Sequence, residues 1–108
     1  MEEQALIQAI NSETGMGLPA HLSLHEIRLQ LQAAINNLIR NDFQQLVYIL
    51  YRVDVNEKKL KFLLQENVGE DAAVIIADLI IARQIEKITS RKQFSRRNDK
   101  MDDEEKWY

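Results

Sequence analysis

The sequence predicts an all-α protein, a compact bundle of four to five short helices. Its 108 residues include three glycines, one proline and 6% aromatic residues. These numbers are lower than a turn-rich β-sandwich or barrel requires. The chain is 45% hydrophobic, which is enough for one modest core. We therefore expect one helical domain over residues 1–93 and a flexible, charged C-terminal tail over residues 94–108.

The first predicted helix covers about residues 2–11, with an apolar stripe formed by Leu6, Ile7 and Ile10. The segment 12–22 follows and contains two glycines and the only proline, so we expect a loop there. This loop is long for a small domain, which suggests that it is mobile or functional.

A capping box predicts where the second helix begins. The Ser23 hydroxyl can accept from the amide three residues later, and Glu26 can reach back to the Ser23 amide. The helix is therefore expected to run from Leu24 to about Arg40. Its apolar positions recur every three or four residues, at Ile27, Leu31, Ala34, Ile35 and Leu38.

A weaker box, Asn41 with Gln44, predicts a tight corner and a third helix over about residues 42–52. The side chains expected to face the core from this helix are Phe43, Leu46, Val47, Leu50 and Tyr51. Residues 51–54 can also form a recognition corner. The stronger interpretation packs Tyr51 with its hydroxyl at the surface and pairs Arg52 with a nearby acid.

A fourth, short helix is predicted after Asp54, which is followed three residues later by Glu57 in the same capping pattern. It carries Leu60, Leu63 and Leu64 and should end before Gly69.

The last predicted helix begins near residue 70 or 71 and ends at about Lys92. Residues 72–82 are apolar on almost every side, and a helix of this kind is normally covered on several sides. We expect Ile76, Leu79 and Ile80 to pack either on the N-terminal helix or on a second copy across a two-fold axis, which makes them a possible homodimer interface.

Asp78 lies within this apolar segment, with no Lys or Arg three or four positions away. An unpaired buried carboxylate costs several kcal/mol. We therefore expect a buried or paired carboxylate, with Arg52, Arg40 or a histidine as the donor. Exposure to water or at a subunit seam, and a chemical role, are weaker alternatives.

Basic residues recur along the end of the last helix and continue into the tail. They form a possible polyanion-binding stripe made of Arg83, Lys87, Arg91, Lys92, Arg96 and Arg97. Ordinary solvated charge at a helix C-terminus explains the same pattern, and an acidic run follows at residues 102–105. The tail then carries Trp107 and Tyr108, a possible docking element for a partner's groove or a neighbouring subunit.

The sequence offers no specific catalytic or metal-binding pattern. It contains no cysteine, and it lacks a glycine-rich phosphate loop and a nucleophile elbow. His21 and His25 are four residues apart, but the Ser23 cap places them on different elements. We predict no catalytic residues, no metal and no cofactor.

The function expected from these features is that of a small non-enzymatic helical protein-interaction module, which can also self-associate through the apolar last helix. The alternative is a nucleic-acid- or polyanion-associated protein that uses the basic stripe. The net charge of −3 gives no overall attraction to nucleic acid. No apolar run reaches the length of a membrane span, so we expect a soluble, cytoplasmic protein.

Overall fold

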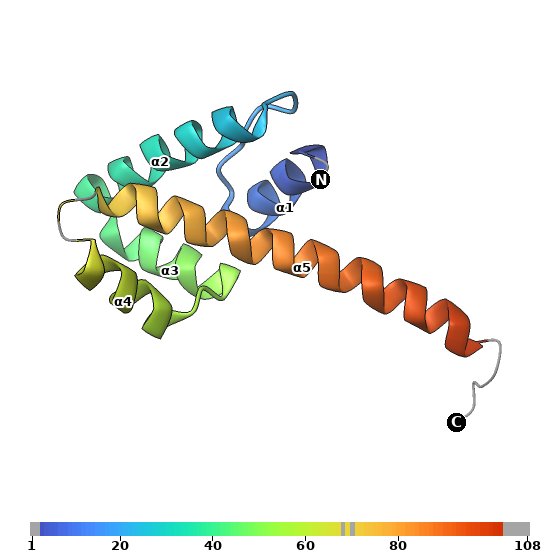
Figure 1. The fold of residues 1–108 in the computed structure, drawn as a ribbon. Helices are drawn as coiled ribbons and strands as arrows, with labels where there is room; N and C mark the ends of the chain where they lie inside the picture. Colours follow the sequence, from blue (N-terminus) through green and yellow to red (C-terminus); the bar gives the residue numbers. More distant parts are fainter. Residues whose placement is uncertain (1–2, 68, 70, 103–108) are drawn as a thin grey trace.

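The computed structural model describes residues 3–67, 69 and 71–102, with side chains described as far as Arg91. The regular structure of these residues is entirely α-helical, as predicted (Figure 1). The helices are α1 (Glu3–Thr14), α2 (Leu24–Asn41), α3 (Phe43–Val53), α4 (Glu57–Glu66) and α5 (Ala72–Asp102). None of the helices in this part of the chain combines the length and hydropathy that a bilayer span requires.

Helix α5 is the axis of the bundle and packs against each of the other four helices. Figure 1 shows those helices gathered around its first half, while its second half projects beyond them. The Cα radius of gyration is 16.4 Å, larger than the roughly 13 Å of a compact chain of this length, because of this projection.

The end of α5 differs from the sequence-based boundary. Residues 94–102 were expected in the tail but belong to α5. They contain no glycine or proline, and their Arg, Lys and Met residues are good helix formers, so an established helix propagates through them. Residues 103–108 of the predicted tail lie outside the described residues.

The core joins one face of each of four helices. Its largest fully buried side chains come from α1, α2, α3 and α5, and they are Leu6, Ile10, Ile27, Leu31, Ile35, Leu46, Ile49, Val53, Ile80 and Gln84. Each fully buried aliphatic side chain stabilises the fold by roughly 1.5–3 kcal/mol relative to exposure. Helix α4 contributes no fully buried residue and packs mainly on α5.

The capping box at the start of α2 is confirmed. The Ser23 hydroxyl accepts from the Glu26 amide at 3.2 Å, and the Glu26 carboxylate accepts from the Ser23 amide at 2.9 Å. The prediction of Asn41 as the next cap is wrong by one residue. Asn41 is the last residue of α2, and the N-cap of α3 is Asp42, whose carboxylate accepts from the Gln45 amide.

Asp54 was predicted to cap the start of the fourth helix, and it instead ends the third. Its backbone is left-handed, with φ of 68°, and its amide donates to the Leu50 carbonyl at 3.0 Å. Asp tolerates this conformation better than most residues. The N-cap of α4 is Asn56, which accepts from the Lys59 amide at 3.0 Å.

Candidate functional site

Helix α3 exposes three large apolar side chains in one row. Phe43 is 61% exposed, Val47 is 50% exposed and Tyr51 is 83% exposed. Their spacing of four residues places them on one side of the helix, which we call the α3 stripe. The prediction that these side chains face the core is wrong. Leu46, which was predicted correctly, faces the core together with Ile49 and Val53, from another side of the helix.

A groove of about 800 Å³ lies between α3 and α4, next to this stripe. Its apolar lining comes from both helices and from the corner between them, and it consists of Val47, Leu50, Tyr51, Val55, Leu60 and Leu64. We call it the α3–α4 groove. It is open because α4 packs mainly on α5 and leaves one side of its leucines uncovered.

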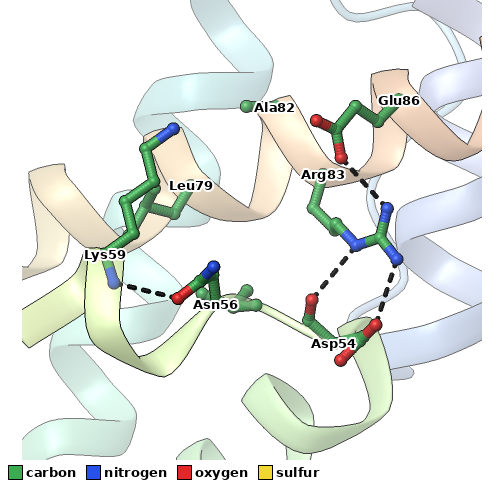
Figure 2. Close-up of a pocket in the computed structure, with 8 residues that line it drawn as sticks. Asp54, Asn56, Lys59, Leu79, Ala82, Arg83 and Glu86 are labelled. Atoms are coloured by element: carbon green, nitrogen blue, oxygen red, sulfur yellow. Dashed lines mark hydrogen bonds and ion pairs between the residues drawn. The ribbon is translucent and has the colours of Figure 1, made fainter.

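A second, polar hollow of about 350 Å³ lies on the α5 side of the same corner (Figure 2). Arg83 reaches from α5 to the corner, where its Nε donates to the Asp54 carbonyl at 3.1 Å and its Nη2 to the Asp54 carboxylate at 3.0 Å. Its Nη1 donates to Glu86 at 3.0 Å. The hydrogen bond to Asp54 is the main cause that raises the pKa of Arg83 above its ordinary value.

These contacts make the polar hollow a structural joint. Three of the five N–H groups of the Arg83 guanidinium donate to Asp54 and Glu86, and the two carboxylates offset its positive charge, so the hollow does not favour an anionic ligand. The joint also fixes the left-handed Asp54 corner on α5. Because Asp54 borders both hollows, the joint holds the mouth of the α3–α4 groove in place.

The charged rim of the α3–α4 groove is basic on the α4 side. Lys58 and Lys61 line it, and Lys61 pairs with Glu57 at 3.3 Å. Both members of that pair are at least 70% exposed, so the pair contributes little and its lysine is available. Lys58 forms no ion pair within the described part of the chain.

A third polar cluster joins α1 to α5. Glu13 accepts from Gln84 Nε2 at 2.8 Å and from Lys87 Nζ at 3.0 Å. Burial raises the pKa of Glu13, but the hydrogen bonds from Lys87 and Gln84 and the nearby positive charges outweigh it and hold that pKa below its ordinary value. Gln84 is completely buried, and its Oε1 has no hydrogen-bond partner. The hydrogen bonds and the ion pair of this cluster therefore fix α1 on α5.

No family model, curated protein or solved structure matches this chain. Any functional assignment therefore has to come from the chemistry of the surfaces described above.

The residues predicted as a dimer interface lie inside the monomer. Ile80 is completely buried, Ile76 is 6% exposed and Leu79 is 9% exposed. Ile76 and Ile80 belong to the core cluster that includes the apolar residues of α1 and α2. Ile76 and Ile80 therefore pack in one cluster with the N-terminal helix, which is one of the two predicted arrangements, whereas Leu79 lies beside the polar hollow next to the corner between α3 and α4. Self-association of the chain stays a prediction.

Asp78 is paired, as predicted, but it is exposed and its partner is Arg28. Arg28 Nε donates to Asp78 Oδ1 at 2.9 Å, and Arg28 Nη2 donates to Asp78 Oδ2 at 3.0 Å. The two residues therefore form a bidentate salt bridge between α2 and α5. The side chains are 42% and 47% exposed. Arg52, one of the predicted donors, instead donates to the Tyr48 hydroxyl at 3.3 Å.

The basic stripe is divided by the fold. Arg83 and Lys87 are occupied by the ion pairs with Asp54, Glu86 and Glu13. Arg91 is exposed. The side chains of Lys92, Arg96 and Arg97 lie outside the described residues, as do Trp107 and Tyr108.

Nothing in the described residues gathers into a metal site, since no three His, Cys, Asp or Glu side chains there lie close enough together. His21 lies in the loop and His25 in the first turn of α2, and both are exposed.

The α3 stripe was predicted to be core together with Leu46 and Leu50, whereas the buried residues Ile49 and Val53 were not among the predicted core positions. The signal was present in the spacing. Positions 46, 49 and 53 form one apolar stripe and positions 43, 47 and 51 form another, which is centred roughly 130° further around this helix of 11 residues. Two separate apolar stripes on one helix indicate that one of them faces something outside the core.

Proposed function

We propose that this chain is a non-enzymatic protein-interaction module that holds an acidic segment with large apolar anchor residues in the α3–α4 groove. The observation that carries the proposal is the exposure of the α3 stripe, with Tyr51 exposed over 83% of its surface. Isolated apolar residues on a surface are ordinary, but a row of them beside an apolar groove is typical of an interaction site.

The groove favours an apolar anchor. Aromatic and large aliphatic side chains that fill a desolvated pocket supply most of the binding energy at protein interfaces. Tyr51 and Val47 belong both to the α3 stripe and to the lining of the groove, so a bound anchor would contact both helices. The Arg83–Asp54 joint holds the corner rigid, which reduces the entropy lost when a segment binds.

The rim favours an acidic partner. Lys58 and Lys61 stand at the α4 edge, and the acidic side chain of the corner, Asp54, is already paired with Arg83. Glu57 also lines this edge and pairs with Lys61, but both side chains of that pair are at least 70% exposed and the pair is weak. Acids flanking the apolar anchors of a bound segment would therefore meet the charge of Lys58 and would compete with Glu57 for Lys61, which increases the association rate and fixes the orientation.

The proposal is tested with random peptides displayed on phage and selected on the folded full chain. We expect enrichment of peptides that combine large apolar residues with flanking acids. Val47→Glu should weaken their binding by roughly tenfold or more, because it places a carboxylate among the anchors. Leu29→Glu is the matched control, since Leu29 lies on α2 and is 51% exposed against 50% for Val47.

Two results would contradict the proposal. One is a selection that enriches no such peptides on the folded chain. The other is binding that Val47→Glu and Leu29→Glu weaken equally, because the α3–α4 groove would then have no special part in it.

A further inference from the structure

The chain itself contains a segment with the chemistry that the α3–α4 groove selects. Residues 102–105 are Asp-Asp-Glu-Glu, and Trp107 and Tyr108 follow after one lysine. This segment supplies acids for the Lys58 and Lys61 rim and two aromatic anchors for the apolar lining. Trp107 is the only tryptophan of the protein.

The fold carries this segment away from the groove of its own chain. Arg83 contacts Asp54 at the mouth of the groove, and α5 then continues as a helix to Asp102 (Figure 1). At 1.5 Å per residue, the helix from Arg83 to Asp102 advances about 28 Å. Residues 103–108 reach at most about 20 Å even when fully extended. The segment therefore falls short of its own groove.

We infer that the acidic aromatic segment 102–108 of one chain docks in the α3–α4 groove of a second copy. The inference rests on the function proposed above and names the partner of that same groove. The acids approach Lys58 and Lys61, and Trp107 packs against Tyr51 and Val47. Self-association then depends on α3, α4 and the end of α5, whereas the apolar first half of α5 stays inside each monomer.

The lone tryptophan allows a direct test in the full chain. The emission of Trp107 should move to shorter wavelength as the protein concentration rises, because docking removes the indole from water. Val47→Glu should prevent this movement, and Leu29→Glu should leave it unchanged. The apparent association constant should also fall steeply with salt, because several acids face the lysines.

A mixing experiment separates the two halves of the contact. Val47→Glu keeps the segment but damages the groove, and Trp107→Ala keeps the groove but contains no tryptophan. Adding the Trp107→Ala chain to the Val47→Glu chain should shift the emission of the only indole present. The same addition of a chain that carries both substitutions should give no shift.

The outcomes distinguish this inference from the function on which it rests. Docking between copies would be overturned if the wavelength of the Trp107 emission maximum did not change with protein concentration, whether that wavelength is long or short. A missing shift in the mixture would overturn it as well. If Trp107→Ala still binds the selected peptides with unchanged affinity in either case, the groove retains its proposed function and only its assigned occupant is wrong.

Discussion

The buried amide of Gln84 donates to the carboxylate of Glu13 at 2.8 Å, across 71 positions of sequence. Lys87 completes the contact one turn further along α5, with a side chain that is only 19% exposed. Helix α1 has few other polar links to the bundle among the described residues, so this cluster and the core residues Leu6 and Ile10 hold it in place.

Glu13→Ala should destabilise the fold by about 2 kcal/mol, because it leaves the buried Gln84 amide and the nearly buried Lys87 ammonium without an acceptor. Urea unfolding monitored by circular dichroism measures the change. Glu57→Ala is the control, since its pair with Lys61 is exposed and should contribute at most about 0.5 kcal/mol. Equal losses in the two variants would show that the Glu13 cluster is not a structural link.

The stability of the wild type should fall with acid more steeply than that of Glu13→Gln. The pKa of Glu13 is held below its ordinary value in the folded chain, so the unfolded state takes up the proton first as the pH falls. The stabilisation is complete above the ordinary carboxyl pKa and is lost as the pH drops through the folded value. Urea midpoints between neutral and acid pH measure the two slopes. The pKa of Glu26 is also lowered, but Glu26 is present in both proteins, so its contribution cancels in the difference between the two slopes. Parallel curves would refute the assignment.

Ile80→Glu should unfold the monomer, with a loss of roughly 3–5 kcal/mol or more, because it buries a carboxylate in a core position that is completely enclosed. Val47→Glu should change the free energy of unfolding by no more than about 0.5 kcal/mol, because Val47 is half exposed. Circular dichroism and light scattering on both variants check this contrast. A folded, monomeric Ile80→Glu chain would contradict this assignment and would support the alternative hypothesis that α5 forms a subunit interface.

The bridge between Arg28 and Asp78 should contribute about 0.5–1 kcal/mol of coupling energy. Its two-pronged geometry is favourable, but both side chains are more than 40% exposed and screened by water. A double-mutant cycle with Arg28→Ala and Asp78→Ala isolates this coupling. The value should shrink as salt is added. A coupling near zero at low salt would show that the bridge does not persist in solution.

The sequence predicts those parts of the fold that depend on neighbours along the chain. The Ser23 and Glu26 box spans four residues, and the helix it starts begins at the expected position. The N-caps of α3 and α4 were misassigned because each corner contains several polar residues that can cap a helix. Which of them becomes the N-cap depends on the path of the chain through the corner. For Asp54, the contact that decides is Arg83, 29 residues away.

The candidate site could not be predicted because it depends on which apolar surface remains uncovered. Periodicity shows that α3 has apolar residues on two sides, but only the packing of α1, α2 and α5 determines that Leu46 and Ile49 are covered and Tyr51 is not. In the same way, Asp78 signalled the need for a partner, while Arg28 lies 50 positions away and no local pattern connects the two.

The most direct test of the proposed function is to map binding on the folded chain by nuclear magnetic resonance. Amide shifts of the full protein would be followed while a selected acidic, aromatic peptide is added. We expect the largest changes on α3 and α4, around Val47, Tyr51, Leu60 and Leu64, and a loss of affinity in Val47→Glu. Changes centred instead on the exposed end of α5 near Arg91, or a peptide that binds only the unfolded chain, would contradict it.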